Sequence, residues 1–376
     1  MDAVGVFCDL SKAFDCVDHD TLIRKLNHYG VKNRALDLVS SYLSNRLQRV
    51  VVNRVQSSGS PVAIGVPQGS ILGPFLFLVY INDLPNLVHE KHDIVLFADD
   101  TSLVFKVDRK QDNYNCINES LLSIVNWFTV NNLLLNAKKT KCIKFTLPNV
   151  KECNDCKVVL KNERLNFEET TVFLGITLDC KLQWGPHISK LTGRLSSAAY
   201  AVKKVRQYTD VNTARLVYFS YFHSVMSYCI LLWGKAADIQ SIFVLQKRAV
   251  RSIYKMGSRA SLREKFKEVN ILTVACQYIL ENIIYVKKHI HLFKKNSDVH
   301  SFNTRSKDKL AVPYFRLQKV NTSFMGNCVR FFNKLPHDFQ KMSLNKFKNF
   351  VKRHLIRKAY YNVNEFINDK TVFLDN

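Results

Sequence analysis

The sequence predicts an α+β first half followed by a basic, all-helical second half. In residues 1–180, short apolar runs bounded by turn residues alternate with segments whose apolar positions recur at helical spacing. From Pro186 onwards the helical patterns are long and rich in lysine and arginine. The charge changes at the same place. Residues 1–180 contain 20 basic and 20 acidic residues, whereas residues 181–376 contain 35 and 11, so the net charge of +24 belongs to the second half.

Composition narrows the class of protein and its partners. A chain of 376 residues that is 47% hydrophobic is long enough for two or three domains with their own cores. A cationic excess confined to one half indicates a polyanionic partner, most commonly nucleic acid. The start of the chain lacks the basic region and cleavage site of a signal peptide, and Arg215 and His223 interrupt the apolar stretch 214–233. We therefore expect an intracellular protein that neither spans nor binds a membrane.

The first half is expected to begin with a strand that ends at an acidic residue. The elements predicted there, in order, are a strand at 4–8, helices at about 19–29 and 36–43, a strand at 50–52, a glycine- and proline-rich loop before an apolar helix at 75–81, a hairpin at 94–105, a long amphipathic helix from 117, and strands at 142–147, 158–161 and 172–178. Asp18 and Asp20 are interpreted as capping residues of the first helix, and His19 as a surface residue.

The second half is expected to consist of helices with one polar interruption. Helices are predicted at 187–208, 211–233 and 240–256, and shorter amphipathic helices at 327–339 and 343–356. The polar stretch 294–309 is predicted to be a linker or mobile loop. We accordingly divide the chain into residues 1–183, 184–256 and 257–376.

Three acidic positions suggest chemistry. Asp9 ends the first strand, and Asp99 and Asp100 lie at the tip of the hairpin. If these strands are neighbours in one sheet, three carboxylates meet at one edge, where they repel unless solvent or a cation relieves them. An exposed acidic turn is one interpretation. The other is a site for Mg²⁺, a hard ion that takes carboxylate and phosphate oxygens, and a pair of such ions about 4 Å apart suits phosphoryl transfer.

An ordered series of motifs resembles those of reverse transcriptases. CDLSKAFDCVDH (8–19), GVPQGSILGPFLFLVYINDLP (65–85) and FADDT (97–101) are similar to motifs A, B and C, and LLLNAKKTKCIKF (133–145) and FLGITLD (173–179) to motifs D and E. Their form resembles the non-LTR, jockey-like retrotransposons. SYCILLWG, LQKRAVRSIY and the stretch from FFNKLPHDF to FKNFVKRHL are similar to the region that follows the polymerase in those elements.

The resemblance implies part of a right-hand polymerase. Residues 1–183 would form the palm, with an antiparallel sheet and packed helices, 184–256 a basic helical thumb, and 257–376 a basic helical C-terminal region. The implied activity is that of an RNA-directed DNA polymerase, which extends a DNA primer on an RNA template with deoxynucleoside triphosphates. The implied cofactor is two Mg²⁺ ions, with Mn²⁺ as a substitute.

The position of the first motif leads to a further expectation. Asp9 is the ninth residue of the chain, so we expect a copy truncated at its N-terminus, with the fingers largely missing. The alternative function is therefore an inactive remnant that only binds nucleic acid through its basic half. An element-encoded RNA-binding protein is a further expected partner, in a ribonucleoprotein of the nucleus and cytoplasm.

The resemblance also assigns roles in the metal and nucleotide sites. Asp9, Asp99 and Asp100 would be the catalytic, metal-binding carboxylates, and the main-chain carbonyl of Leu10 a further ligand. The residues implied to lie at the nucleotide are Phe14, Gln68, Gly69 and Lys139. Phe14 would exclude the 2′-hydroxyl, although a core aromatic is the alternative. Glycine at 69 would permit close backbone approach, and Lys139 would lie near the pyrophosphate unless the lysines there form a solvated run.

The remaining roles concern the nucleic acid. Phe173, Leu174 and Gly175 would form the primer grip, although any hairpin turn with a glycine gives the same pattern. The residues implied to contact the phosphate backbone are Lys190, Arg194, Lys203, Lys204, Arg206, Lys247, Arg248 and Arg251. Such contacts give affinity without sequence preference, and binding that depends on them weakens as salt rises.

Overall fold

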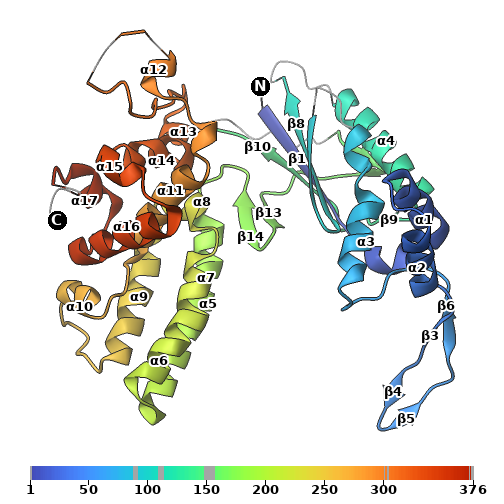
Figure 1. Ribbon diagram of the computed structural model, residues 1–376, viewed down its shortest axis with the longest axis horizontal. Coiled ribbons are helices and arrows are strands. Elements are labelled where there is room, and N and C mark those ends of the chain that lie inside the picture. The colour runs from blue at the N-terminus through green and yellow to red at the C-terminus, as the bar shows by residue number, and fades with distance from the viewer. Residues whose placement is uncertain are drawn as a thin grey trace. The chain divides into compact units, whose positions relative to one another are not determined.

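The computed structural model describes residues 2–87, 92–108, 114–147, 157–299, 301–302, 305–371 and 373. The chain divides into two compact units, Met1–Leu182 and Gln183–Asn376 (Figure 1). The first unit mixes strands and helices. The second is helical, apart from one isolated β-bridge between Lys295 and Leu310 in the part that the structure describes. The α+β class predicted for the first half and the helical class predicted for the second are confirmed.

A four-stranded antiparallel sheet forms the centre of the first unit. Its order is β10 (Lys141–Phe145), β1 (Asp2–Cys8), β8 (Asp100–Val107) and β7 (His92–Phe97). Val4 and Val6 of β1 are fully buried, as are Leu103 and Phe105 of β8. Successive side chains of a strand point to opposite faces, so these alternate residues give the sheet one apolar face.

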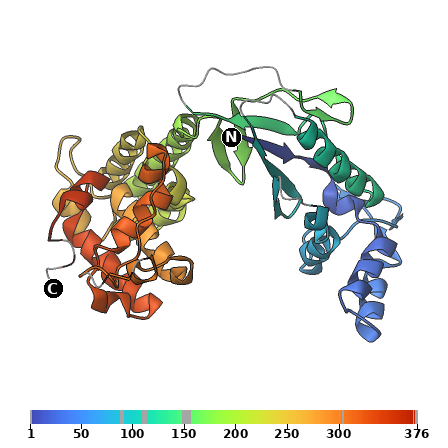
Figure 2. The ribbon, with the colours of Figure 1, turned by 90° about the horizontal axis from the view of Figure 1, so that it is seen from above.

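Helices cover this sheet on one side (Figure 2). They are α1 (His19–His28), α2 (Arg34–Leu43), α3 (Leu72–Ile81) and α4 (Asn115–Val130), with short 3₁₀ turns at Ala13–Cys16 and Leu84–Leu87. Leu22, Phe77 and Leu121 from three of these helices join the strand residues in one core. Asp18 caps α1 as predicted, because its Oδ1 accepts a hydrogen bond of 2.8 Å from the Thr21 amide.

A narrow β-ribbon extends from the first unit (Figure 1). β3 (Arg46–Gln48) pairs with β6 (Ser60–Val62), and β4 (Val51–Val52) with β5 (Val55–Gln56). The sequence predicted a strand at 50–52 without its partners. Val51, Val52 and Val55 are each more than 60% exposed, so no buried face gives these strands an alternating pattern.

Three short hairpins or strand pairs complete the first unit. β2 (Leu10–Ser11) pairs with β9 (Leu134–Leu135), and β11 (Val159–Leu160) with β12 (Glu163–Arg164). The strand predicted at 172–178 is wrong, because this segment is a hairpin of β13 (Thr170–Phe173) and β14 (Ile176–Asp179). Leu174 and Gly175 have φ of 47° and 78°, as a two-residue type I′ turn requires.

The second unit begins with long helices near the predicted positions. α5 spans Gly185–Tyr208 and packs along α9 (Ile239–Ile253). The single helix predicted at 211–233 is wrong. It is divided into α6 (Val211–Val217), a π-helix (Tyr218–His223), α7 (Ser224–Ser227) and α8 (Ile230–Trp233), with Cys229 at φ 49°. A continuous apolar pattern does not reveal such interruptions.

The rest of the second unit is built around α11 (Val274–Lys288), which is buried on almost every face. The other elements are α10 (Arg263–Glu268), a 3₁₀ turn at Ile290–Leu292, α12 (Asn296–Val299), α13 (Gln318–Thr322), α14 (Phe324–Phe332), α15 (His337–Gln340), α16 (Leu344–Lys358) and α17 (Val363–Asn368). Among the described residues, no helix combines the length and apolarity needed to cross a membrane.

The polar stretch 294–309 is closed by main-chain hydrogen bonds. The Asn296 amide donates to the Lys309 carbonyl at 2.9 Å, and the Ala311 amide to the Lys294 carbonyl at 2.8 Å. Residues 300, 303 and 304 of this stretch lie outside the described residues. Its mobility stays a prediction, as does the division of the second unit at residue 256.

Candidate active site

The sheet delivers three carboxylates to one edge. Asp9 directly follows β1, Asp99 lies in the two-residue turn between β7 and β8, and Asp100 begins β8. The β1–β8 register pairs Cys8 with Thr101, so the next position along each strand brings Asp9 beside Asp100. Ala98 precedes the acidic pair with φ 52°, a region that L-residues seldom adopt. This tight turn holds Asp99 at the end of the strands.

The three carboxylates influence one another electrostatically. Partial desolvation raises the pKa of Asp100 above 3.8, and repulsion from Asp99 and then from Asp9 raises it further. Carboxylate oxygens are the donors that a hard divalent cation prefers, and such a cation would relieve this repulsion. The three carboxylates are therefore of the chemical type that binds a hard divalent cation. Their side chains do not form a ready-made cluster, since no group of three potential ligands suited to a metal occurs among the described residues.

The segment after α4 is fastened to the first aspartate. The Asn136 amide donates to the Asp9 carbonyl at 2.9 Å, and Lys139 Nζ lies 3.9 Å from Asp9 Oδ2. Leu10 pairs with Leu135 in the small β2–β9 ladder. The Lys139 side chain is 70% exposed, so this long ion pair contributes at most about 1 kcal/mol. The structure therefore places Lys139 near the carboxylate edge and leaves its ammonium accessible.

Phe14, which follows Asp9 in the chain, packs against the helical core. Its ring stacks on Phe77 of α3 with centroids 4.6 Å apart, and its carbonyl accepts a hydrogen bond of 2.8 Å from the Val66 amide. The side chain is half-buried. Phe14 thus packs in the core, as the alternative of a core aromatic predicts, while part of its surface stays accessible to a ligand.

The loop before α3 is bound to the segment that follows β1. Gln68 Nε2 donates to Asp15 Oδ1 at 2.9 Å. Gly65 has φ 88°, and a Cβ built there would lie 2.9 Å from the Asp15 backbone, so this position needs glycine. Gly69 also has a positive φ, of 81°, but its missing Cβ faces open space. In this loop the backbone approaches Asp15 closely at Gly65, whereas the space at Gly69 could admit another molecule.

Two residues of this region were missed or misread from the sequence. His19 was expected on the surface, which is wrong. It is half-buried, and its Nε2 lies 2.7 Å from the Gly65 carbonyl. Asp15, whose place beside the first motif invites a metal or base role, is instead the hydrogen-bond partner of Gln68. The partners are separated by 46 and 53 residues, so no local pattern could have revealed them.

The hairpin predicted as the primer grip lies against the same sheet. The Phe173 ring is 5.6 Å from the Phe7 ring of β1, between centroids. The Thr146 amide, just after β10, donates to the Cys180 carbonyl, just after β14, at 2.9 Å. Leu174 and Gly175 form the turn. The structure thus joins all three residues in one hairpin that packs on the sheet.

In the second unit, four of the eight predicted backbone contacts lie together. Lys203, Arg206, Arg248 and Arg251 line a cavity of about 690 Å³ between α5 and α9, with Lys255 beside them. Two of them also stabilise the fold. Arg206 donates to the Ile253 and Thr209 carbonyls at 2.8 and 2.9 Å, and Arg251 to the Ala260 carbonyl at 2.9 Å.

The other four predicted contacts are dispersed. Lys190 and Arg194 lie towards the start of α5, a helix of 24 residues and about 36 Å. Burial lowers the pKa of the nearby His187, and the charges of Arg194 and Lys190 lower it further. Lys204 lies over the Tyr200 ring, and Lys247 over the Phe243 ring. The eight residues are therefore not one patch.

Comparison with known proteins identifies the first unit. A family model described as "Reverse transcriptase (RNA-dependent DNA polymerase)" matches residues 1–178. The "Probable RNA-directed DNA polymerase from transposon BS" of Drosophila melanogaster is 32% identical over 66% of this chain and 28% of its own length. The "RNA-directed DNA polymerase from mobile element jockey" of the same species is 31% identical over 67% of this chain and 28% of its own. The chain thus spans little more than a quarter of these relatives.

Solved structures give a much weaker likeness. A telomerase from Candida tropicalis in complex with a fragment of telomeric RNA has a TM-score of 0.41 at 11% identity, over 93% of this chain and 49% of its own. A telomerase from Candida albicans gives 0.34 at 13% identity, over 72% and 49%. These scores add nothing to the assignment, which depends on the family model and the sequence relatives.

Proposed function

We propose that this chain extends a DNA primer on an RNA template. The premise is that residues 1–178 belong to the reverse transcriptase family and that the chain is related to the polymerases of non-LTR retrotransposons. The observation that carries this proposal is the meeting of Asp9, Asp99 and Asp100 at one sheet edge. The segment around Lys139 contacts that edge at Asp9, and the loop around Gln68 is attached to Asp15, which follows Asp9 in the chain. In this function the first unit is the palm, and residues 184–256 are the thumb.

The carboxylates are proposed to hold the metal ions. Asp9 and Asp99, with the main-chain carbonyl of Leu10, would bind two Mg²⁺ ions, or Mn²⁺ in their place, and Asp100 would complete the negative charge around them. Bound divalent ions would activate the primer hydroxyl and stabilise the leaving oxygen. The chain's own contribution is positional, because β1 and the tight turn after β7 fix the carboxylates on a rigid sheet.

The incoming nucleotide is proposed to lie beside the loop before α3. Phe14 is held by Phe77 and by the Val66 amide, so its ring could act as a rigid wall against a 2′-hydroxyl. The open space at Gly69 admits a base or sugar close to the backbone. Lys139 carries an exposed ammonium near Asp9, where it could neutralise the triphosphate.

The nucleic acid is proposed to be held by two further features. The hairpin of Phe173, Leu174 and Gly175 packs on the sheet and would position the primer end. The cations along α5 and α9 would contact phosphates. Lys203 and Arg248 are exposed and suited to this role, whereas Arg206 and Arg251 also bind main-chain carbonyls.

Primer extension tests the proposal. The purified full chain would be incubated with a labelled DNA primer on an RNA template, deoxynucleoside triphosphates and Mg²⁺. We expect extension, and we expect Asp99→Asn to lower its rate by about a hundredfold or more, because one charged group that stabilises the transition state is lost. Asp93→Asn is the control, since it removes an exposed carboxylate of β7 at the other end of the same hairpin.

Two results would overturn the proposal. Equal extension by the wild type and Asp99→Asn would remove the carboxylates from the reaction. Binding of the primer–template without any metal-dependent extension would favour the alternative, a protein that only binds nucleic acid.

A further inference from the structure

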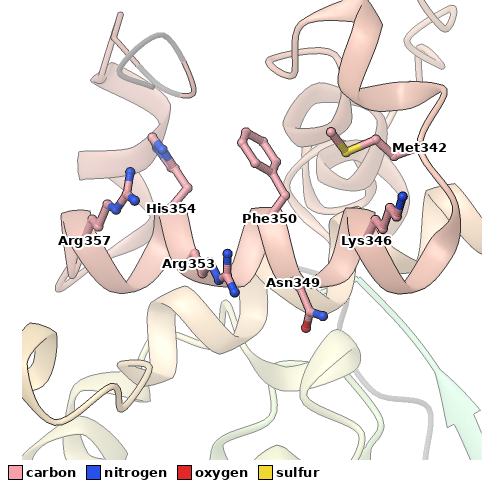
Figure 3. Close-up of a pocket in the computed structure, with 7 residues that line it drawn as sticks. All are labelled: Met342, Lys346, Asn349, Phe350, Arg353, His354 and Arg357. Atoms are coloured by element: carbon pink, nitrogen blue, oxygen red, sulfur yellow. The ribbon is translucent and has the colours of Figure 1, made fainter.

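A cationic pocket lies on α16, far along the chain from the motifs described above. Its volume is about 440 Å³, and its lining residues all come from α16 and the turn before it (Figure 3). They are Met342, Lys346, Asn349, Phe350, Arg353, His354 and Arg357. Three of the seven are basic and none is acidic. The family model ends at residue 178, so it assigns nothing to this surface.

The basic residues of this pocket are available to a ligand. Lys346, Arg353 and Arg357 are exposed, and none of them has an ion-pair or hydrogen-bond partner among the described residues. Other lysines of the chain are already engaged, for example Lys358 with Asp369 at 3.7 Å. Cations gathered without a counter-charge repel one another, and an anion relieves that repulsion. The pocket therefore suits a polyanionic ligand.

The pocket has a rigid floor. Phe347, Val351 and Leu355 are fully buried on the opposite face of α16, which packs against α11. The Phe350 ring stacks on Phe339 with centroids 3.9 Å apart, and the His354 ring lies 4.3 Å from that of Phe373. Because the aromatic side chains are fixed by one another, the cations project from a preformed surface and lose little backbone entropy on binding.

The spacing of the cations fits phosphates along one strand. Arg353 and Arg357 are four residues apart, so about 6 Å separates them along the axis, and Lys346 lies about 10 Å before Arg353. The separation of Arg353 and Arg357 is close to that of neighbouring phosphates of a single strand, and the larger separation of Lys346 suits a phosphate further along the same strand. Arginine adds a planar fork that binds phosphate oxygens in pairs. Asn349 adds an uncharged amide to the lining.

We propose that this α16 pocket binds the sugar–phosphate backbone of a single nucleic-acid strand. The inference rests on the proposed function only in requiring the chain to hold nucleic acid, and it does not depend on catalysis. Residues 257–376 would then contain a second binding site for RNA or DNA, separate from the cations of α5 and α9.

The test is equilibrium binding of the full chain to fluorescent oligo-U RNA and to oligo-dT DNA at several salt concentrations, without nucleotides or metal. Arg353→Ala/Arg357→Ala removes two phosphate contacts. We expect affinity for the preferred strand to fall about tenfold or more, and the slope of log K against log salt to become shallower by about 1.4. Comparison of the two oligonucleotides identifies which strand the pocket takes.

Lys348→Ala/Lys352→Ala is the matched control. It removes the same charge from the same helix at exposed positions outside the pocket, and we expect a change in slope of less than about 0.5. Arg353→Lys/Arg357→Lys, which keeps charge and helix, should retain most of the salt slope. Equal losses in the two alanine variants would overturn the proposal, and so would an unchanged slope in the arginine variant. Binding to anionic vesicles is measured with the same proteins. If Arg353→Ala/Arg357→Ala keeps the wild-type affinity for oligonucleotides but no longer binds the vesicles, the pocket binds a membrane surface and the proposal is overturned.

If Arg353→Ala/Arg357→Ala fails to fold, its helical circular dichroism will be lost. In that case Arg353→Lys/Arg357→Lys decides. Lysine is a point charge without the fork, so its affinity should fall by a factor of a few while its slope persists. An unchanged affinity in the lysine variant would contradict the phosphate contacts.

Discussion

The two units of this chain use charge in opposite ways. Met1–Leu182 contains 21 basic and 20 acidic residues, whereas Gln183–Asn376 contains 34 and 11. In the first unit the informative charges are few, and specific contacts hold them, such as the ion pair of Asp9 with Lys139 and the hydrogen bond from Gln68 to Asp15. In the second unit the charges are many and mostly exposed. A reaction at one site needs a few charged groups in fixed positions, whereas attraction to a charged polymer needs many charged groups.

This contrast predicts how single substitutions behave. A carboxylate at the sheet edge of the first unit has no substitute nearby, so its loss should affect the reaction far more than the fold. A lysine of the second unit shares its task with neighbours, so its loss should affect affinity slightly. The predictions below would break or sharpen this contrast, from the largest expected effect to the smallest.

Asp9→Asn should have the largest effect, on turnover. The substitution removes one charge from the carboxylate edge while keeping the side chain's shape, so extension should fall by about a hundredfold or more. Affinity for the primer–template should change less than about twofold. Extension and equilibrium binding measured on the same preparation check this, and a loss of affinity equal to the loss of rate would break the contrast.

Lys25→Met should destabilise the first unit by about 3 kcal/mol. Lys25 Nζ donates to the Tyr80 carbonyl at 2.6 Å and to Asp83 Oδ1 at 2.7 Å, and it lies over the Trp127 ring. Without the ammonium, the mostly buried carbonyl and carboxylate lose their partner. Urea unfolding measures the change. Lys267→Met is the control, because its ion pair with Glu264 is a local one on the surface of α10 and should contribute less than about 1 kcal/mol.

Gly65→Ala should destabilise the same unit by about 1–3 kcal/mol, because the new Cβ enters the Asp15 backbone and the φ of 88° is strained for alanine. Gly193→Ala offers the matched control. Gly193 lies within α5 and has open space around its missing Cβ, so alanine should be neutral or stabilising by up to about 1 kcal/mol. Urea unfolding measures both, and equal effects would refute the close approach at Gly65.

Asp100→Asn should have the smallest effect, seen in the pH dependence of unfolding. Because the pKa of Asp100 is raised above 3.8 in the fold, the folded chain binds its proton more tightly than the unfolded chain. The contribution of Asp100 to stability therefore falls as pH rises through that pKa. With EDTA present, the asparagine variant should gain stability relative to the wild type between about pH 4 and pH 7. A variant that becomes relatively less stable over this range would contradict the repulsion.

Parts of the site were predictable because strand ends are visible in the sequence. An apolar run that stops at Asp9, and another that stops at Asp99, indicate two carboxylates at strand ends. Their meeting depends on β1 and β8 being neighbours, which the pattern alone left conditional and the register confirms. The same logic located the helices, whose apolar faces repeat along the chain.

Other parts were not predictable because their cause is tertiary. The ribbon of β3–β6 has exposed side chains and pieces of two or three residues, so periodicity is absent. The π-helix at Tyr218–His223 keeps the apolar composition of a normal helix. The contact of His19 with Gly65 joins residues that only the fold brings together. The pocket on α16 depends on Phe339 and Phe373 packing from outside the helix.

The most direct test of the division between the units is single-turnover primer extension, with the protein varied from below to far above the primer–template concentration. The account predicts that Asp99→Asn keeps the wild-type dissociation constant and loses the rate constant at saturation. It predicts the reverse for Arg353→Ala/Arg357→Ala, with a weaker dissociation constant and a wild-type rate at saturation. A slow rate at saturation in the arginine variant, or full recovery of Asp99→Asn at high protein concentration, would contradict it.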